Sequence, residues 1–262
     1  MSYFTQEQKT QWKDNGFVHL KGFLNEALAQ DIKDWTQELY EWEEAPGKWM
    51  KYFETSSDTG ERLLCRVENF IDYHKGIKGF LCGEMIYGMV SELMGEQAVL
   101  FKEKINFKYP GGAGFAYHQD APAFTSFGQK YHITMMVSVD ASNEENGCLR
   151  MAHGFSEEKT LEQEPDGTVC KKLAAKLDWR PLETGPGDLV LFNSYVPHYS
   201  EANTSDRSRR AMFITYNRLS EGEKRLDYFK DKREKFPPEA ERIEGKDYSS
   251  AESLYNLGNP IK

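Results

Sequence analysis

Hydrophobic residues in the first third of the chain recur every three or four positions, which is the spacing of one face of an α-helix. The clearest series follows Asn25, a favourable N-cap residue, and stops at Pro46-Gly47. Its members are Leu28, Ile32, Trp35, Leu39 and Trp42. A similar apolar series predicts another helix over residues 79–94. The first third is therefore expected to be mainly helical.

A shorter helix is expected near the start of the chain. Thr5 and Gln8 stand three residues apart, as in a capping box, where each side chain bonds the backbone N–H of the other residue. Gly16 can end this helix because glycine readily adopts left-handed backbone angles. Residues 16–22 then predict a short strand.

Alternation with a period of two, which is typical of β-strands, begins near residue 99. Residues 101–109 alternate and are followed by Pro110-Gly-Gly112, a strong turn signal. Three more β-rich runs cover residues 131–140, 189–192 and 210–216. Strands that follow one another without helices favour an antiparallel sandwich or barrel over a parallel sheet. Residues 221–235 return to a charge-rich helix, expected to lie solvated on the outside of the barrel.

Composition narrows the class of protein without indicating a chemistry. The 262 residues include 33 basic and 42 acidic side chains, and the net charge of −9 argues against nucleic acid as a partner. No apolar run approaches the roughly 18 residues that cross a bilayer, and the first residues do not resemble a secretion signal. The four cysteines form no CxxC pair and are predicted to be reduced, so we expect a cytoplasmic protein.

Candidate chemistry centres on His118 and Asp120. On an extended backbone these two side chains point to the same face and can converge on one ion. One His-x-acid pair is expected by chance in a chain with six histidines and 42 acidic residues, so the pair alone does not indicate a metal site. Other residues in the sequence must support it. His198 follows the apolar strand at 189–192, and two histidines with one carboxylate form the facial triad of non-haem Fe(II) oxygenases. Arg209, at the start of the next strand, suits a bidentate bond to a dicarboxylate.

Five short motifs, taken in order, resemble the phytanoyl-CoA dioxygenase family. They are His118-Gln-Asp120, Asn146-Gly-Cys-Leu149, Gly185-Pro-Gly-Asp188, Val196-Pro-His-Tyr-Ser200 and Arg209-Arg-Ala211. The resemblance extends over roughly residues 10–220. It implies a mainly β fold with flanking helices, in which an N-terminal helical region packs on a double-stranded β-helix (jelly-roll, cupin-like) core. It also implies Fe(II), with 2-oxoglutarate and O2 as cosubstrates. One departure is Ala152-His-Gly154, where the family usually has Pro-Gly.

The resemblance assigns roles by position. The metal ligands and catalytic centre would be His118, Asp120 and His198. Because Asp120 is present, the halogenating branch of the family, which lacks this carboxylate, is disfavoured. The distal carboxylate of 2-oxoglutarate would be bound by Arg209, with Ser200 beside it. The family lines the rest of the cosubstrate site at positions that correspond here to Asn106, Thr134 and Met136.

The chain is expected to form a single oxygenase domain, because no repeat or low-complexity linker interrupts it. Three regions are predicted within it. They are a helical N-terminal region and lid at 1–98, the jelly-roll core at 99–217, and a C-terminal helix and tail at 218–262.

The substrate is predicted from segments that usually cover the active-site mouth in this family. Cationic, amide and aromatic side chains there would suit a small polar, anionic or zwitterionic molecule; they are Lys51, Arg66, Asn69 and Tyr73. The same residues are as readily explained by surface and helix packing. The runs 66–69 and 131–138 resemble a bacterial subgroup that hydroxylates 2-aminoethylphosphonate, or its N-methylated relatives, at the carbon next to phosphorus. Candidates to flank such a substrate are Phe124, His132 and Tyr195, although His132 equally suits a structural position in the core.

Two other functions stay open from the sequence alone. The same oxygenase chemistry could act on an acyl-CoA, lipid or secondary-metabolite substrate, which would call for a long apolar channel and a basic patch. The other is a non-catalytic β-barrel metal-binding protein, against which the retained Arg209 and Ser200 argue. In each case the predicted partner is a small molecule, with no nucleic acid and no membrane.

Overall fold

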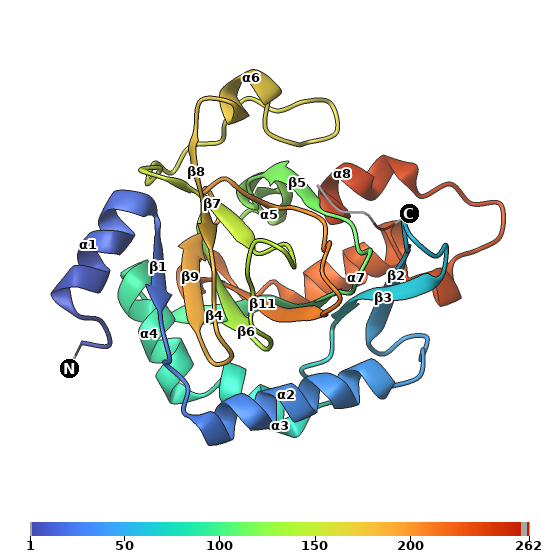
Figure 1. Cartoon of the computed structure of the whole chain (residues 1–262), viewed down its shortest axis with the longest axis horizontal. Coiled ribbons are helices and arrows are strands. Elements are labelled where there is room, and N and C mark those ends of the chain that lie inside the picture. Colours follow the sequence, from blue (N-terminus) through green and yellow to red (C-terminus); the bar gives the residue numbers. More distant parts are fainter. Residues whose placement is uncertain (1, 258–260, 262) are drawn as a thin grey trace.

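Two antiparallel β-sheets form the core of the chain, and helices cover one side and one end of it (Figure 1). The structure is a computed structural model that describes residues 2–257 and 261. The seven-stranded sheet has the order β1 (Phe17–Leu20), β9 (Leu189–Asn193), β6 (His132–Ser138), β11 (Arg209–Arg218), β4 (Ala98–Lys108), β3 (Arg62–Glu68) and β2 (Met50–Thr55). The four-stranded sheet has the order β5 (Phe115–His118), β10 (His198–Ser200), β7 (Leu149–His153) and β8 (Asp178–Leu182). The predicted jelly-roll core with flanking helices is thus confirmed.

The helices divide into an N-terminal group and a C-terminal group. The first group comprises α1 (Gln6–Asn15), α2 (Glu26–Glu41), α3 (Lys75–Leu81) and α4 (Glu84–Met94), and α2 and α3 run together along one side of the large sheet (Figure 1). The remaining helices are α5 (Ala121–Phe124), α6 (Lys171–Ala174), α7 (Arg225–Lys235) and α8 (Glu252–Tyr255). In the part of the chain that the structure describes, no helix combines the length and apolarity needed to cross a membrane.

The local signals at the helix ends are confirmed. Thr5 and Gln8 form the full capping box, and Gly16 ends α1 with a left-handed φ of 70°. The Asn25 side chain accepts a hydrogen bond from the Leu28 N–H at the start of α2. These features depend only on residues a few positions apart, which is why the sequence predicts them well.

The predicted helix over 79–94 is two helices. The break falls at Cys82 and Gly83, where Gly83 is extended (ψ 157°) and acts as the N-cap of α4. A Cβ added to Gly83 would lie 2.7 Å from the Gly79 carbonyl oxygen, so the glycine permits a close backbone approach that another residue would prevent.

The first 98 residues hold three strands besides their helices, so this region is less helical than the sequence indicates. Strands β2 and β3 extend the large sheet beyond β4, with Val67 of β3 opposite Ile105 of β4. Polar residues at alternate positions of β3, Arg66 and Glu68, are both buried. In the sequence they are typical of a solvent-facing strand, because nothing local indicates that a second sheet and a helix cover them.

Strand β4 determines what faces the interior of the jelly-roll. Its odd-numbered residues Ile105 and Phe107 belong to the apolar core that the N-terminal helices cover. After a register irregularity between Leu100 and Lys102, the even-numbered residues point to the opposite face because side chains alternate along a strand. These are Lys102, Lys104, Asn106 and Lys108, a polar row that runs along the inside of the core.

Helix α7 is not a fully solvated helix, contrary to the prediction from its charge. Its residues Tyr228 and Phe229 pack in a core cluster with Phe101 and Phe124, and Lys232 on the same face is completely buried. Because α7 lies against β4 at the end of the barrel, both apolar and charged side chains on its inner face are buried.

Candidate active site

Three predicted metal ligands meet between two strands of the small sheet. His118 ends β5 and His198 begins β10, and the two residues are direct partners in the antiparallel register. Their imidazole rings lie side by side, with centroids 4.2 Å apart. One ligand atom each from His118, Asp120 and His198 falls within a common span of 4.8 Å, which matches the spacing of groups around a single ion.

Asp120 reaches this point from a turn and not from an extended strand. Its backbone is helical (φ −73°, ψ −31°), and it immediately precedes α5. The next residue, Ala121, donates its N–H to the Ser194 carbonyl oxygen at 2.8 Å, which ties the turn to the loop before His198. The expected convergence of His118 and Asp120 therefore occurs, with a different backbone, and Asp120 Oδ1 lies 4.0 Å from His118 Nε2.

Both histidines are oriented by backbone carbonyl groups. Nδ1 of His118 lies 2.7 Å from the Ala116 oxygen, and Nδ1 of His198 lies 3.0 Å from the Val196 oxygen. An Nδ1–H that donates to each carbonyl leaves the Nε2 lone pair of both rings directed away from it, available for a metal. Such outer contacts fix the tautomer and orientation of metal-binding histidines.

The charge states also suit a divalent ion. Burial, followed by the neighbouring His198, lowers the pKa of His118 to about 3, and burial lowers the pKa of His198 as well. Burial alone would raise the pKa of Asp120, but His198, Lys104 and Lys102 together hold it below its usual range. Two neutral imidazoles and an ionised carboxylate are the forms that bind a metal, so these residues fit Fe(II).

Arg209 points into a cavity that the triad residues also line. It begins β11, its side chain is buried, and one NH2 group donates to the Gly147 carbonyl oxygen. Its buried Nε has no hydrogen-bond partner in the described part of the chain. Burial lowers the pKa of Arg209 to about 10, which leaves the guanidinium charged near pH 7. A buried cation with an unused N–H implies an anionic ligand, and a carboxylate fits both features.

Lys108, which the sequence analysis did not select, lies beside Arg209 as its partner in the register of β4 and β11. Its buried Nζ donates to Ser200 Oγ at 2.8 Å and also to the Glu201 carbonyl oxygen. Burial, followed by the positive charge of Arg209, lowers the pKa of Lys108 well below its usual value, and Lys108 bonds Ser200, which lines the Arg209 cavity. The alternation of residues 101–109 could have indicated Lys108, because it shares a strand face with Asn106.

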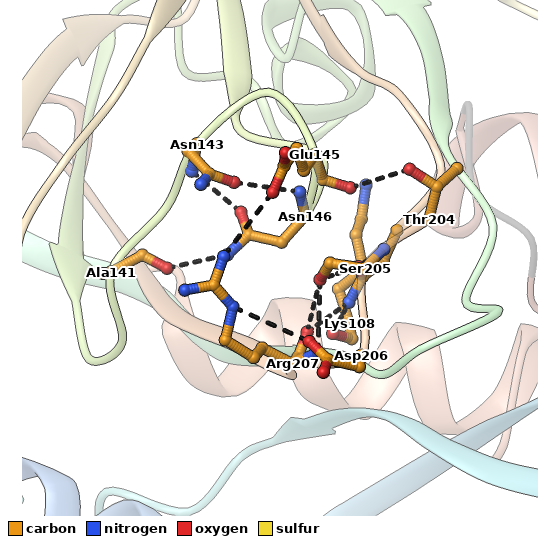
Figure 2. A network of polar contacts seen from close by, with 10 residues as sticks. Lys108, Ala141, Asn143, Glu145, Asn146, Thr204, Ser205, Asp206 and Arg207 are labelled. Carbon is orange, nitrogen blue, oxygen red and sulfur yellow. Dashed lines mark hydrogen bonds and ion pairs between the residues drawn. The ribbon is translucent and has the colours of Figure 1, made fainter.

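A network of polar contacts joins the loop that contains Asn143, Glu145 and Asn146 to the loop that contains Thr204 and Arg207 (Figure 2). Asn146 Nδ2 donates to the Ala141 oxygen at 2.9 Å, and Asn146 Oδ1 accepts from the Asn143 N–H at 2.8 Å. Thr204 bonds the Glu145 carbonyl oxygen, and Arg207 lies 3.6 Å from the Glu145 carboxylate (Figure 2). The loop that carries Gly147 is thereby fastened to the loop that precedes β11.

Gly147 links this network to Arg209, and a substitution there is our first prediction. Its φ is 72°, and an added Cβ would collide with the Glu201 carbonyl oxygen and lie 3.0 Å from Lys108 Nζ. We expect Gly147→Ala to lower the thermal midpoint by several degrees, since left-handed backbone costs about 1 kcal/mol or more outside glycine. It should also raise the KM for 2-oxoglutarate, measured by succinate release.

Gly154, on the far side of β7, provides a matched control for that prediction. Its φ is 70°, but an added Cβ would meet no atom within 4 Å. Gly154→Ala should therefore lower the thermal midpoint without changing the KM for 2-oxoglutarate. Equal KM values for both variants would contradict the link between Gly147 and the Arg209 cavity.

A second cavity adjoins the first and contains three cationic side chains. Both cavities share Lys104 and the triad residues His118 and Asp120, and the second also includes Arg66 and Lys102. Lys102 and Lys104 form no ion pair within the described residues. Burial lowers the pKa of both lysines by more than the nearby carboxylates of Asp120 and Glu68 raise it. This cavity is therefore electrostatically suited to an anion next to the metal ligands.

The three other predicted cosubstrate residues lie in the barrel with different contacts. Asn106 lines the Arg209 cavity, and its Oδ1 accepts from Arg66 Nε at 3.2 Å. Thr134 Oγ1 lies 3.4 Å from Asp120 Oδ2, so it contacts a triad carboxylate. Met136 packs in an apolar cluster with Phe213 and does not line that cavity.

Of the predicted substrate residues on the N-terminal segments, Arg66 lines the second of the two cavities described above, and the other three line neither of these two. Lys51 donates to the Tyr40 and Trp42 carbonyl oxygens, at 2.9 and 2.6 Å. Asn69 bonds the Lys48 carbonyl oxygen and Arg225. Tyr73 is 43% exposed. The ammonium of Lys51 is therefore already bonded, because it satisfies the last carbonyl groups at the C-terminal end of α2.

The remaining three candidates also differ in their positions. Phe124 lines the cationic cavity, and its ring lies 4.3 Å from Lys102 Nζ. His132 is buried behind it, between Phe101 and Phe124, as the structural interpretation of this histidine requires. The Tyr195 hydroxyl donates to the Lys130 carbonyl oxygen at 2.8 Å. Neither His132 nor Tyr195 lines the two cavities described above.

Comparison with known proteins relates this geometry to a family and to several relatives. A profile of the family described as Phytanoyl-CoA dioxygenase (PhyH) matches residues 12–211. A methylphosphonate hydroxylase from Gimesia maris is 40% identical over 232 residues, covering 88% of each chain. A probable alpha-ketoglutarate-dependent hypophosphite dioxygenase from Stutzerimonas stutzeri is 29% identical, covering 80% of this chain and 77% of its own.

The fold has close counterparts among solved structures. EctD from S. alaskensis, solved with 2-oxoglutarate and 5-hydroxyectoine, superimposes with a TM-score of 0.70 at 14% identity, over 84% of this chain and 78% of its own. At this identity the similarity is one of fold.

Proposed function

The chain belongs to the phytanoyl-CoA dioxygenase family, and from this premise we propose that it hydroxylates a small organophosphonate at the carbon next to phosphorus. It is a non-haem Fe(II)- and 2-oxoglutarate-dependent dioxygenase, with O2 as the second cosubstrate. When bound, the iron supplies O2 activation coupled to the oxidative decarboxylation of 2-oxoglutarate to succinate and CO2, and thereby hydroxylation of a C–H bond.

The residues that line the two cavities would have separate roles in binding the metal, binding 2-oxoglutarate and excluding water. His118, Asp120 and His198 would hold the metal on one face and leave the other positions open. Arg209, with Lys108 and Ser200, would bind and orient the distal carboxylate of 2-oxoglutarate. Apolar residues that line the Arg209 cavity, Phe115 and Phe213 among them, would exclude water from the reacting atoms.

One observation carries the assignment of a phosphonate: the cationic cavity beside the triad. Arg66, Lys102 and Lys104 line it, and Asp120, a predicted metal ligand, is its one acidic lining residue in the described chain. A phosphonate carries up to two negative charges on three acceptor oxygens, which suits several convergent cations. The relatives named for methylphosphonate and hypophosphite support a phosphorus oxyanion as the group recognised.

The organic part of the substrate follows from the apolar lining of the same cavity. If the phosphonate is held by the cations, the adjoining carbon can lie on the side of His118 and Asp120, because Lys104 is shared between the two cavities. The candidates are 2-aminoethylphosphonate, its N-methylated forms and methylphosphonate. Tyr228 and Tyr255 also line the cavity and offer aromatic faces to an alkyl or ammonium group.

The alternatives are less well supported. An acyl-CoA or lipid would need a long apolar channel, whereas the two cavities that adjoin the triad have several charged side chains in their walls. A non-catalytic metal-binding barrel is inconsistent with a family of enzymes and with relatives that are a hydroxylase and a dioxygenase. The cytoplasmic location stays a prediction, and the absence of disulfides among the four cysteines is consistent with it.

A substrate panel tests the proposal. Anaerobic enzyme with Fe(II) and 2-oxoglutarate would be mixed with oxygenated buffer and with methylphosphonate, 2-aminoethylphosphonate, its N-trimethyl derivative, hypophosphite, ectoine, proline or an acyl-CoA. We expect succinate release to be stimulated by a phosphonate, and phosphorus NMR to detect the 1-hydroxy product. Stimulation by an acyl-CoA or amino acid, with none by any phosphonate, would refute it.

Removing one cation of this cavity gives the second prediction. Lys102 lines the cationic cavity but not the Arg209 cavity. We expect Lys102→Met to raise the KM for the phosphonate by about 30-fold or more, the equivalent of losing about 2 kcal/mol from a buried charge contact. The KM for 2-oxoglutarate should stay within about twofold. Lys21→Met, at an exposed position, is the matched control, and an unchanged phosphonate KM in Lys102→Met would contradict the assignment.

A further inference from the structure

The C-terminal segment closes one side of the cationic cavity with apolar and aromatic side chains. Four residues form this C-terminal wall: Tyr228 of α7, Leu254 and Tyr255 of α8, and Leu257 directly after it. The family profile ends at residue 211, so the wall lies outside the part of the chain that the profile matches. The metal ligands and Arg209 all lie inside the matched part, so the wall belongs to a different part of the chain from these groups.

Tyr255 is held in this wall by contacts at both ends of its side chain. It is 4% exposed, and its hydroxyl donates to the Asp231 carboxylate on α7. Its ring makes an edge contact with the Tyr228 ring, with centroids 5.7 Å apart and 68° between the ring planes. Because the hydroxyl is already bonded, the ring is the part of Tyr255 that faces the cavity. A large substrate could not displace this ring without breaking these contacts.

The lining residues divide the cavity into a polar side and an apolar side. The polar side contains the lysines of β4 and the triad residues His118 and Asp120. The apolar side consists of the C-terminal wall together with Ala123 and Phe124 of α5, against which α8 packs (Figure 1). If the lysines hold an anionic group and its neighbouring carbon lies at the triad, the apolar side is left for the rest of the organic group. That group would therefore contact the C-terminal wall.

The apolar side is unsuited to a chain that ends in a cation. Asp120 is the one acidic residue that the described part of the chain contributes to this cavity, and it is a predicted metal ligand. Lys102 Nζ lies 4.3 Å from the centre of the Phe124 ring and 5.5 Å from that of the Tyr228 ring, so a cation already lies over these aromatic groups. A substrate ammonium would lie close to Lys102 with no carboxylate to pair with it, which is unfavourable. An uncharged alkyl group has no such cost and gains free energy from burial.

We infer that Tyr255 is a specificity-determining residue, which together with Leu254 and Leu257 limits the organic group of the substrate to a short, uncharged alkyl chain. The inference rests on the proposed function, since it concerns the same cavity. Among the candidate substrates it selects methylphosphonate over 2-aminoethylphosphonate and its N-methylated forms.

Three phosphonates test this inference on the wild-type enzyme. Propylphosphonate and 2-aminoethylphosphonate have equally long chains, but the first ends in a methyl group and the second in an ammonium group. We expect kcat/KM, from succinate release at saturating 2-oxoglutarate, to be about 10-fold or more higher for methylphosphonate than for propylphosphonate, which is the scale on which a closed pocket discriminates methylene groups. It should be about 10-fold or more higher for propylphosphonate than for 2-aminoethylphosphonate, because like charges repel. A wild type that prefers 2-aminoethylphosphonate to propylphosphonate would overturn the inference.

Substitutions of Tyr255 test the residue itself. Tyr255→Ala should raise kcat/KM for propylphosphonate relative to methylphosphonate by about 10-fold, because loss of the ring leaves room for a longer chain. Tyr255→Phe should keep the wild-type ratio within about threefold, since the ring remains. Tyr248→Ala is the matched control, because Tyr248 is a buried tyrosine of the same segment that lines neither cavity.

A second variant keeps the inference testable if Tyr255→Ala does not fold. Leu257 is only half-buried, so Leu257→Ala should cost less stability, and it should change the propyl-to-methyl ratio in the same direction. Anaerobic calorimetry of the enzyme loaded with Fe(II) and 2-oxoglutarate should give the same order of affinities for the three phosphonates without turnover.

The outcomes distinguish this inference from the proposed function. If the wild-type enzyme neither binds nor converts any phosphonate, the proposed function fails and the inference fails with it. If phosphonates are converted but Tyr255→Ala and Leu257→Ala leave the propyl-to-methyl ratio unchanged, only the inference is overturned. An equal change of this ratio in Tyr248→Ala also overturns it, since looser packing of the C-terminal segment would then account for the effect.

Discussion

The His118→Ala variant is expected to release succinate at less than about one hundredth of the wild-type rate, since loss of even an outer partner of a metal ligand can cost up to about 100-fold. The side chain offers Nε2 to a point shared with Asp120 and His198, and its Nδ1 is already engaged with the Ala116 oxygen. Among the described residues, no fourth His, Cys, Asp or Glu belongs to this group to replace it. Metal binding should fall in parallel, measured as Fe(II) or Co(II) retained per protein after gel filtration.

A second histidine variant shows whether this loss is specific. His153 ends β7 in the same small sheet and makes an edge contact with Phe17, away from the triad. His153→Gln should retain both metal and succinate release within about twofold. Full turnover by His118→Ala, or an equal loss in both variants, would show that the triad is not the metal centre.

The Arg209→Ala variant is expected to raise the KM for 2-oxoglutarate by about 100-fold, which corresponds to about 3 kcal/mol for one partner of a buried, hydrogen-bonded charge pair. Arg209 is 3% exposed, and its Nε has no partner in the described chain, so a carboxylate there would complete its hydrogen bonds. The KM of Arg209→Lys for 2-oxoglutarate should lie between those of the wild type and Arg209→Ala, since lysine keeps the charge but cannot form the bidentate contact. Succinate release at varied 2-oxoglutarate concentration measures the KM of all three proteins.

The KM for the phosphonate separates the two cavities in this experiment. Arg209 lines the first cavity and not the adjoining cationic one, so its loss should leave the phosphonate KM nearly unchanged at saturating 2-oxoglutarate. Arg180→Ala is the surface control, because its side chain is 60% exposed and lines neither cavity. If Arg209→Ala raised the phosphonate KM alone, the assignment of the two cavities would be reversed.

Local patterns were sufficient for most elements of the fold. The alternation of 101–109 and the apolar run at 189–192 correspond to β4 and β9, and the capping residues of α1 and α2 are where the sequence predicts them. Strands β2 and β3 were missed, because their inward positions carry charged side chains that are typical of a solvent-facing strand. Their partners, β4 and the C-terminal segment, are distant in sequence.

The candidate site was predictable where one motif contains the necessary residue types. His118 with Asp120, His198 and Arg209 were selected from their spacing and from the family resemblance, and the structure brings them to one cavity. Most of the predicted substrate residues were selected from short segments without knowledge of which face is buried. Lys51 illustrates the difficulty, since its ammonium binds the carbonyl groups that end α2.

The sequence by itself therefore determined the reaction class, because the ligand types, their order and the flanking strands are local properties. Only the tertiary structure decided which cations accompany them. Lys102 and Lys104 come from β4, Arg66 from β3 and Lys232 from α7, and they meet because a sheet and a helix close over the polar face of β4. Alternation specifies that these lysines share a face, but burial of that face depends on packing between segments more than 100 residues apart.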